Sequence, residues 1–588
     1  MRTQYPRTPH LPWSPGATPD DLRAGDLAAL RGREVVVTEK LDGENTTLYR
    51  DGLHARSVDS AHHPSRTWVK ALQGRIGHAV APGLRVCGEN LYARHSIGYD
   101  GLESYFYAFS VWDGDHCLDW DATVRFARRI GVPLPPVLWR GIFDERALRA
   151  LKPDTTRQEG YVVRTVAGFD RADFGRRVAK WVRPAHVRTD THWMHAAVVP
   201  NGLGPRAALW EAASGGPVGA PALSAALGPE PAGSEPAGPA DPEAAGAALA
   251  EVTGRLDVLG RTGSARLAGV LAALLHGARR SALAPRLVAP LGVPLARRVA
   301  DLVGLHPALH RPYPDADRRA GLVRLSYAAD LGVLHAVSLA ALAGREGPES
   351  DADRERAEWS ALVAEDAGLL GEAPLEEVRH GLREALSDHP AEVGDRCWAE
   401  AREGFALGRI STPQEAVALG WRWRSGAFPR LVVMSGPSGS GKSAFARALP
   451  GVDEIVSLDD LRQARGSRAD QRANPEILRA GLERLDAALT PGRTVVWDAT
   501  SLNQQQRSLV QGVAHRRDAL TTHAVLLVGP AELARRNAAR EHPVPPGVLA
   551  AQLGRFGPPY PGQAHRTWYI GPDGTVGDTD GTLDSEVQ

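Results

Sequence analysis

The sequence predicts a multidomain protein: an α+β domain first, an all-α central domain next, and an α/β domain with a phosphate-binding loop last. In residues 1–210 short apolar runs alternate with turn residues, which is typical of strands in a mixed domain. Residues 245–415 carry apolar residues at three- and four-residue spacing, which predicts helices. Residues 425–588 begin with an apolar run and a glycine-rich segment, as α/β nucleotide-binding domains do. Residues 211–244 are rich in Ala, Pro and Gly, so we expect a flexible linker there.

Composition narrows the function classes. The 588 residues are enough for about three or four domains of ordinary size. Lys plus Arg number 69, equal to Asp plus Glu, so any surface that binds nucleic acid must be a local basic patch. The three cysteines lie far apart, which disfavours a disulfide framework and a cysteine zinc site. With no apolar leader and no run of 18 apolar residues, we expect a cytoplasmic enzyme.

The first candidate site is the segment 38–45, Thr-Glu-Lys-Leu-Asp-Gly-Glu-Asn. The apolar run 35–37 predicts a strand that ends just before Lys40. We expect partial loss of hydration there to lower the pKa of Lys40 and make it a nucleophile that can hold AMP as a phosphoramidate. Asp42 and Gly43 predict a tight turn that brings the backbone close to a ligand. By itself K-x-D-G also fits a β-turn with a solvated lysine.

The segments that follow this motif in the sequence favour the AMP-carrying lysine over the simple β-turn. They are, in chain order, a polar strand at 53–58 with Arg56, Glu89 at the end of 86–90, Phe109 in the aromatic strand 105–112, Glu159 at the head of 159–164, and Lys180 in 178–184. This order resembles the motifs of the covalent ATP-dependent ligases and capping enzymes, over about residues 30–195. It is most similar to RNA ligases of the double-strand-sealing phage type. The resemblance implies an ATP-grasp-like nucleotidyltransferase fold.

The resemblance also implies roles, with Lys40 as the residue that carries AMP. On the nucleoside, the backbone of Glu39 would read the adenine, Glu89 would contact the ribose and Phe109 would stack on the base. On the phosphates, Arg56 would hold the nucleotide or the incoming 5′-phosphate, and Lys180 would neutralise the α-phosphate in the transition state. Glu159 would bind a divalent metal. The implied nucleotide-binding set is Glu39, Asp42, Gly43, Asn45, Arg56, Glu89, Phe109, Glu159, Lys180 and Arg183.

Two features near the end of this region depart from a simple pattern. The family usually shows K-x-K in its last motif, but here the residues are Lys180-Trp181-Val182-Arg183, so the identity of the second cation stays open. The segment 186–195 contains three histidines and resembles the corresponding region of bacterial RNA ligases. Its spacing fits no zinc signature, and its role stays open.

The central block has a weaker pattern. His276-Gly277, Asp301, His306, His310 and Asp330 faintly resemble the HD-type metal-dependent phosphohydrolases. Gly277 stands where the aspartate of the His-Asp pair would be. The block is therefore either a degenerate HD-like domain or a helical spacer, and we favour the spacer.

The second candidate site is a phosphate-binding loop. Residues 431–434 predict a buried strand, and G-x-x-x-x-G-K-S follows directly, before a predicted helix. Backbone amides of such a loop wrap the β- and γ-phosphates, a lysine adds charge and the last hydroxyl can ligate Mg²⁺. The residues expected to bind the nucleotide are Gly436, Ser438, Gly439, Ser440, Gly441, Lys442 and Ser443, with Ser443 as the metal ligand.

The residues that follow the phosphate-binding loop in the sequence indicate which molecule accepts the phosphate. Two later strands are predicted to end in Asp459 and Asp498, where carboxylates can abstract a proton or contact a metal. Over about residues 428–570 the sequence resembles the phage-type polynucleotide 5′-kinases. That resemblance implies Asp459 as general base, Arg462, Asp498 and Arg507 as acceptor-binding residues, and Arg536 and Arg540 as arginines on the donor phosphates. Small-molecule P-loop kinases share this scaffold.

Together the two candidate sites predict a bacterial RNA repair ligase–kinase. It would phosphorylate a 5′-OH end and seal the 5′-phosphate to a 3′-OH through a lysyl-AMP intermediate, with ATP and Mg²⁺ or Mn²⁺. Its partner would be RNA with such ends. Three alternatives stay open: a DNA end-repair ligase–kinase, an RNA ligase fused to a small-molecule kinase, and a nucleic-acid end sensor with decayed sites.

Overall fold

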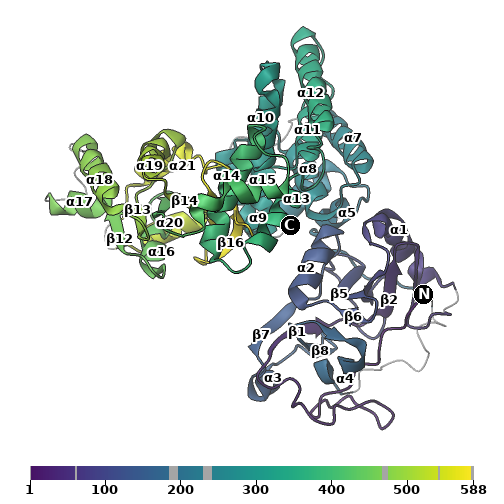
Figure 1. Cartoon of the computed structure of the whole chain (residues 1–588). Coiled ribbons are helices and arrows are strands. Elements are labelled where there is room, and N and C mark those ends of the chain that lie inside the picture. Colours follow the sequence, from purple (N-terminus) through teal and green to yellow (C-terminus); the bar gives the residue numbers. More distant parts are fainter. Residues whose placement is uncertain are drawn as a thin grey trace. The chain divides into compact units, whose positions relative to one another are not determined.

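The structure, a computed structural model, describes residues 2–59, 62–184, 197–229, 241–465, 474–540 and 543–584, without the side chains of residues 315, 316 and 474. The chain divides into two compact units (Figure 1). Unit 1 comprises Met1–Pro229 and Leu256–Leu267, and unit 2 comprises Glu230–Arg255 and Ala268–Val587. The predicted segment 186–195 lies outside the described residues.

Unit 1 is built on two antiparallel sheets with the strand orders β10-β8-β1-β7 and β3-β2-β4-β5-β6-β9. The strands are β1 (Glu34–Lys40), β2 (Glu44–Tyr49), β3 (Gly52–His54), β4 (Leu84–Asn90), β5 (Phe106–Asp113), β6 (His116–Cys117), β7 (Val137–Ile142), β8 (Gly160–Thr165), β9 (Phe169–Asp170) and β10 (Val178–Val182). The helices are α1 (Thr67–Ile76), α2 (Trp120–Arg129), α3 (Glu145–Ala150), α4 (Phe174–Arg177), α5 (Ala207–Ala213) and α6 (Ala220–Leu227).

The side chains of β1 alternate between an apolar core on one face of the sheet and the face that carries Lys40. Val35 and Val37 pack into an apolar cluster with Leu11, Leu27 and Leu30 on one face of the sheet. Lys40 belongs to the opposite face, because successive side chains of a strand alternate. The register pairs Lys40 with Gly160 and Thr38 with Val162, and β10 pairs Lys180 with Val162. Lys40 and Lys180 therefore lie on the same face of this sheet.

The first residues of the chain cover the outer edge of β10. We call residues 2–16 the N-terminal segment. The Leu11 amide donates to the carbonyl of Lys180 at 2.7 Å, and the Lys180 amide donates to the carbonyl of Pro9 at 2.9 Å. Tyr5 from the same segment places its ring 5.2 Å from that of Phe109, edge to face. Residues 20–30, which follow this segment, form turns and an isolated bridge.

Unit 2 contains a six-stranded sheet with the order β12-β13-β11-β14-β15-β16, in which β16 alone is antiparallel to its neighbour. The strands are β11 (Arg430–Ser435), β12 (Glu454–Ser457), β13 (Thr494–Asp498), β14 (Leu520–Leu526), β15 (Arg566–Ile570) and β16 (Val576–Asp580). The helices of this part are α16 (Lys442–Ala448), α17 (Leu458–Ala464), α18 (Asn474–Ala488), α19 (Gln504–Arg516), α20 (Pro530–Ala538) and α21 (Pro546–Arg555).

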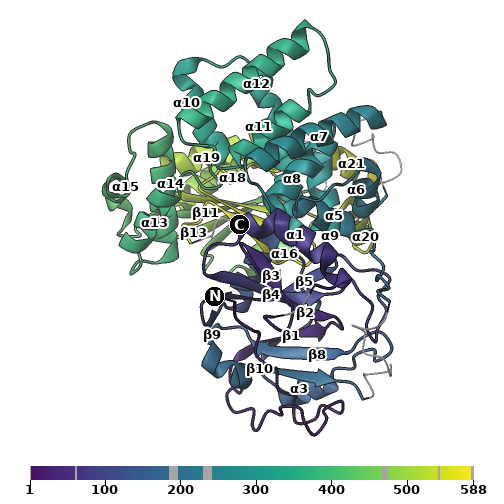
Figure 2. The same cartoon turned by 90° about the vertical axis from the view of Figure 1, so that its right-hand side faces the viewer.

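The apolar run of β11 reflects burial on both faces. Leu431 and Val433 pack in a cluster with residues of α18 and α19, and Val432 and Met434 pack in another with α16. Figure 2 shows these helices on the two sides of β11 and β13. Parallel strands covered on both faces read as continuous apolar runs, which is why the sequence predicts this strand well.

The middle of the chain is helical, which agrees with the predicted all-α character. Its helices are α7 (Pro242–Val258), α8 (Gly263–Leu274), α9 (Arg280–Leu305), α10 (Asp315–Ser326), α11 (Leu331–Ala340), α12 (Pro348–Asp366), α13 (Glu376–Ala385), α14 (Ala391–Ala406) and α15 (Pro413–Leu419). Helices α10 and α11 are separate, because Asp330 caps α11 by accepting the Val333 amide at 3.2 Å. Helix α9 is interrupted at Gly292, where φ is 75°.

Helices α13, α14 and α15 share an apolar core with the sheet of unit 2. Leu382 and Trp398, from α13 and α14, pack in one cluster with Phe428, Leu520 and Leu583. Figure 1 shows α9, α14 and α15 near β16, and α9 contacts that strand. The helical block expected as a separate domain at 245–415 is thus largely part of the same unit as residues 425–584. The linker expected at 211–244 also differs, since α6 folds within it.

Within the described residues, no single helix is both long and apolar enough to cross a membrane; one pair, Asp317–Ser326 with Leu331–Ala340, passes that test only when joined across a 100° bend. All three cysteines are buried free thiols.

Candidate active sites

Lys40 is the last residue of β1 and lies in a carboxylate environment. Its ammonium donates to the carboxylate of Glu159, which directly precedes β8. The Lys40 side chain is 23% exposed and that of Glu159 is 9% exposed. Burial acts to lower the pKa of Lys40, but the charges of Glu159 and Glu89 outweigh it and the net shift is upward. The expected depression of this pKa was therefore wrong for the protein without nucleotide, because two carboxylates compensate for the lost hydration.

The second sheet contributes the facing carboxylate, Glu89. It lies on β4 opposite Asn45 of β2, and its Oε1 accepts the Gly43 amide at 3.2 Å. Burial raises the pKa of Glu89 to about 8, with Lys40 acting in the opposite direction. The structure thus brings Asn45, Glu89 and Gly43 together at the turn after Lys40, as the sequence predicts.

The turn itself is held from two sides. The Asp42 carboxylate accepts the Ile97 amide at 2.9 Å, and the Asp42 amide donates to the Tyr99 hydroxyl at 2.9 Å. Burial raises the pKa of Asp42 to about 6, and the nearby Glu159 adds to the shift. Gly43 is required sterically, because a Cβ there would lie 2.5 Å from the carbonyl oxygen of Asn90.

Tyr99 and Asn201 are site-supporting residues that the sequence analysis missed. The Asn201 side chain is buried; its Oδ1 accepts the Tyr99 amide at 3.0 Å and its Nδ2 donates to the carbonyl of Leu91 at 2.8 Å. Asn201 therefore holds the loop whose tyrosine contacts Asp42. A single sequence offers little signal for this role, because Asn in an Asn-Gly pair normally indicates a turn.

The predicted base-binding residues come from different sheets, Glu39 from β1 and Phe109 from β5. The Glu39 amide already donates to the carbonyl of Pro136 at 2.8 Å, and Gln158 donates to the Glu39 carboxylate at 3.0 Å. Phe109 is half-buried on β5 and packs on the same cluster as Val162 and Tyr5. Burial raises the pKa of Glu39.

The basic residues of the first site separate into two groups. Lys180 faces the site, and burial together with the nearby charge of Lys40 lowers its pKa. Arg183 does not join it: it follows the end of β10, is only 2% exposed and donates to the carbonyl of Thr155. Val182 occupies the position that shares a face with Lys180. Arg56 is exposed and lies beyond β3, which ends at His54, so the strand expected at 53–58 is shorter.

The second site begins where β11 ends. Gly436, Gly439 and Gly441 have φ values of 152°, 83° and 105°, which side chains with a Cβ rarely adopt. The Ser438 amide donates to Oε1 of Gln552, from α21, at 2.8 Å. The buried Ser440 hydroxyl has no hydrogen-bond partner among the described residues, which suits a loop that receives a ligand.

Lys442 and two aspartates meet beside this loop. The Lys442 ammonium donates to the carbonyl of Pro437 at 2.8 Å. Burial lowers the pKa of Lys442 to about 8, against the opposing charges of Asp498 and Asp459. Asp498 ends β13 and is buried, whereas the Asp459 side chain is 65% exposed and bonds Arg462 at 2.5 Å. Ser443 is half-buried in the first turn of α16.

Two of the three remaining predicted arginines reach the loop. Arg536 donates to the carbonyl of Ser440 at 3.4 Å, and Nη1 of the exposed Arg540 lies 3.9 Å from the position of a Cβ at Gly439. Arg507 does not reach it. It is buried in α19, where it donates to the carbonyl of Ser501 at 3.0 Å, so a role in holding the acceptor does not fit its position.

The three HD-like histidines lie in a row, with ring centroids 6.2 Å apart for His276 and His306 and 5.7 Å apart for His306 and His310, but both aspartates have other partners. Asp301 pairs with Arg280 and Arg297, and Asp330 caps a helix. His306 bonds the carbonyl of His276, and His310 bonds Ser338. These contacts are those of a packed helical core.

A divalent metal ion fits both sites only if the protein and the nucleotide each supply some of its ligands. Within the described residues, no group of three or more His, Cys, Asp or Glu side chains is arranged to hold a metal ion. Mg²⁺ is commonly bound through one or two protein oxygens together with substrate phosphates. Glu159 beside Lys40, and Ser443 with Asp498 beside Lys442, supply oxygens of that kind.

Comparison with known proteins supports the two sites at the level of domains. The RNA ligase family model matches residues 33–182, and the AAA domain model matches residues 431–559. No curated protein matches the chain. The solved structures that match include a Naegleria gruberi RNA ligase mutant with ATP and Mn, at 19% identity over 27% of this chain and 52% of that chain, with a TM-score of 0.21.

Two other solved structures match parts of the chain. An archaeal ATP-dependent RNA ligase matches at 15% identity over 31% of this chain and 48% of its own, with a TM-score of 0.22. A gluconokinase from Sinorhizobium meliloti matches at 23% identity over 26% of this chain and 86% of its own, with a TM-score of 0.20. The chain thus spans about half the length of the RNA ligases that it matches. The family models confirm the predicted pair of domains in outline: residues 33–182 are an RNA ligase domain, and residues 431–559 are an AAA domain with a phosphate-binding loop.

Proposed function

We propose that this protein heals and seals RNA ends: its P-loop domain phosphorylates a 5′-OH, and its ligase domain joins the resulting 5′-phosphate to a 3′-OH. One observation carries the proposal. Within the RNA ligase domain, Lys40 contacts Glu159, lies within the electrostatic influence of Glu89 and shares a sheet face with Lys180. A nucleophile, its carboxylate partners and a second cation in one place suit nucleotidyl transfer.

The ligase reaction would proceed in three displacements at phosphorus. The Lys40 amine attacks the α-phosphorus of ATP, so that an N–P bond forms and pyrophosphate leaves. Because the Lys40 pKa is raised in the free protein, the amine must first lose a proton, and Glu159 is the acceptor already bonded to it. An oxygen of the RNA 5′-phosphate then takes AMP from Lys40. Finally the 3′-OH attacks the 5′-phosphorus, a phosphodiester forms and AMP leaves.

The kinase reaction would use Asp459 as the base. Asp459 takes the proton of the RNA 5′-OH while that oxygen attacks the γ-phosphorus of ATP, and ADP leaves. Lys442 and the loop amides hold the donor phosphates, and Arg462 holds the acceptor phosphate. The exposure of Asp459, beside the buried Lys442, supports an acceptor that arrives as the end of a large molecule. A Mg²⁺ or Mn²⁺ ion at each site would neutralise phosphate charge.

The test uses a nicked RNA duplex with 5′-OH and 3′-OH ends, ATP and Mg²⁺. The wild-type protein is expected to seal it. Lys40→Ala should leave the nick open with a 5′-phosphorylated strand, and Asp459→Asn should fail on this nick but seal one that already carries a 5′-phosphate. A DNA nick of the same sequence tests the substrate. Sealing of DNA in preference to RNA, or absence of the lysyl-AMP adduct, would overturn the proposal; ADP release that RNA ends do not stimulate would point to a small-molecule acceptor.

A further inference from the structure

We propose that the helical block completes the kinase site, and that Arg280 of α9 is a positioning residue for the phosphate-binding loop. It would act through residues 556–560, which we call the exit segment because they follow α21. The inference deepens the proposed function, in that it concerns the ATP side of the same kinase site. Arg280 lies outside the region that the AAA domain model matches.

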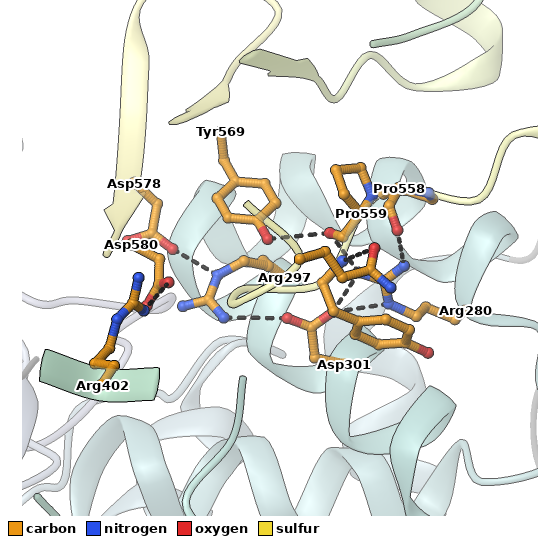
Figure 3. Close-up of polar contacts among 11 residues, drawn as sticks. Arg280, Arg297, Asp301, Arg402, Pro558, Pro559, Tyr569, Asp578 and Asp580 are labelled. Atoms are coloured by element: carbon orange, nitrogen blue, oxygen red, sulfur yellow. Dashed lines mark hydrogen bonds and ion pairs between the residues drawn. The ribbon is translucent and has the colours of Figure 1, made fainter. Parts of the chain in front are cut away.

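Arg280 holds the exit segment by three contacts, of which Figure 3 shows the two hydrogen bonds to Pro558 and Pro559. Its guanidinium donates to the carbonyl of Pro558 and, at 3.1 Å, to that of Pro559. Its Cζ lies 3.6 Å from the ring centroid of Tyr560, which is a close cation–π contact. Three successive residues of the exit segment are therefore bound by one side chain from a distant part of the sequence.

The guanidinium is itself fixed by a buried carboxylate. Arg280 Nε donates to Asp301 at 2.7 Å, and Asp301 is fully buried. Arg297 donates to the other oxygen of Asp301 at 3.1 Å and, through Nε, to Asp578 of β16 at 2.7 Å. Charge-assisted hydrogen bonds of this kind are short and directional. Arg280 is thus anchored to the kinase sheet through Asp301, Arg297 and Asp578, as Figure 3 shows.

The exit segment connects directly to the nucleotide site. The Gly557 amide donates to the carbonyl of Leu502 at 2.8 Å, in the loop that follows the buried Asp498. The segment also begins directly after α21, whose Gln552 accepts the amide of Ser438 in the phosphate-binding loop at 2.8 Å. Helices α21 and α9 are in contact. The position of the exit segment therefore constrains both α21 and the loop behind Asp498.

This arrangement predicts a kinetic effect in addition to a structural one. Loop amides bind phosphates only if they are held in the right place, and small displacements at a catalytic site are costly. Arg280→Met keeps much of the side-chain volume but removes the hydrogen bonds to Pro558 and Pro559. The loop should then hold ATP less well. Arg280→Lys should restore part of the effect, because lysine keeps the charge but lacks the fork-shaped donor set.

The experiment measures ADP release from ATP in the presence of RNA with a 5′-OH end. ADP reports the kinase alone, because the ligase releases pyrophosphate and AMP. We expect Arg280→Met to raise the KM for ATP by about tenfold, a fold-change within the range for a displaced site. Formation of lysyl-AMP at Lys40 in the same sample should be unchanged, which controls for the amount of protein and the fold of unit 1; an unchanged urea-unfolding midpoint of unit 2 controls for the fold of the part that carries Arg280. Arg409→Met, at an exposed arginine of the helical block, is the matched control and should leave ADP release unchanged.

A double-mutant cycle with Gln552→Ala tests the route. If Arg280 acts through α21, the double variant should lose little more than the worse single variant. Independent effects in the cycle, or an unchanged KM in Arg280→Met, would overturn the inference. If the wild-type protein releases no ADP with RNA, the proposed acceptor is wrong, and the inference is tested by binding of a fluorescent ADP analogue. The part of that binding lost in Lys442→Ala belongs to the kinase site; Arg280→Met should weaken it about tenfold, and unchanged binding would refute the inference.

Discussion

The ion pairs between α9 and β16 predict that Arg297→Met selectively destabilises unit 2. Arg297 Nε lies 2.7 Å from Asp578, and Nη1 lies 3.1 Å from Asp301, with all three side chains less than a tenth exposed. Removal of Arg297 leaves the Asp578 carboxylate buried without this partner, while Asp301 keeps Arg280. Loss of one member of a buried pair costs about 3–5 kcal/mol. The free energy of unfolding of unit 2 should fall by about that amount.

A surface pair provides the matched control. Arg324 and Glu403 lie 2.6 Å apart, but their side chains are 46% and 51% exposed. Because water screens such a pair, Arg324→Met should cost about 0–1 kcal/mol. The two substitutions are chemically identical and both fall on helices of unit 2, so burial is the main difference between them.

The assay is urea unfolding followed by brief proteolysis, with peptides assigned to unit 1 or unit 2 by mass spectrometry. The unfolding midpoint of unit 2 should drop in Arg297→Met, and that of unit 1 should stay constant. A loss below about 1 kcal/mol, comparable to that of the exposed pair, would show that the buried pair is not held as described. An equal drop of the unfolding midpoint in both units would refute the prediction that Arg297→Met acts on unit 2 alone.

Three further predictions follow from charge and burial. The pKa of Glu89 is about 8 against a usual 4.5, so the folded state binds its proton more tightly and the stability of the protein falls as pH rises between these values. The urea-unfolding midpoint of Glu89→Gln should equal that of the wild type near pH 4 and lie above it at pH 8. Lys442 has a pKa of about 8, so the KM for ATP in ADP release should rise above that pH in the wild type but not in Lys442→Arg. Lys180→Met should slow lysyl-AMP formation by about 10²–10³, whereas Arg183→Met should change stability and leave the rate per folded molecule nearly constant; similar rates for the two variants would contradict their separation.

The parts of the structure that the sequence predicts well are those set by local pattern. The strand before Lys40 and the strand before Gly436 both follow from apolar runs, and the glycine spacing of the second loop requires the backbone conformations seen there. Lys40, Glu159 and Lys180 meet because two hydrogen-bonded registers align them. The order of the motifs along the sequence was sufficient to assign these residues to one site, although it gives no information on the distances between them.

The errors have distinct physical origins. The pKa of Lys40 depends on carboxylates that come from β4 and β8, which a local argument about hydration could not include. The position of Arg507 had a readable signal, because Val510 and Val513 are buried at three-residue spacing on the same helix and so place Arg507 on the inner face. The merging of the helical block with the P-loop domain depends on pairs such as Arg297 and Asp578, which lie 281 residues apart and leave no trace in the periodicity of the sequence.

The N-terminal segment has a practical consequence for work on the isolated ligase domain. The region matched by the RNA ligase model starts at residue 33, well after the residues that pair with β10. A fragment cut at that point would lose Pro9 and Leu11, and the peptide groups of Lys180 would face solvent along an open strand. Such an edge is a template for pairing between molecules. Poor solubility of that fragment would then report a cutting site inside the fold and would say nothing about the chemistry of Lys40.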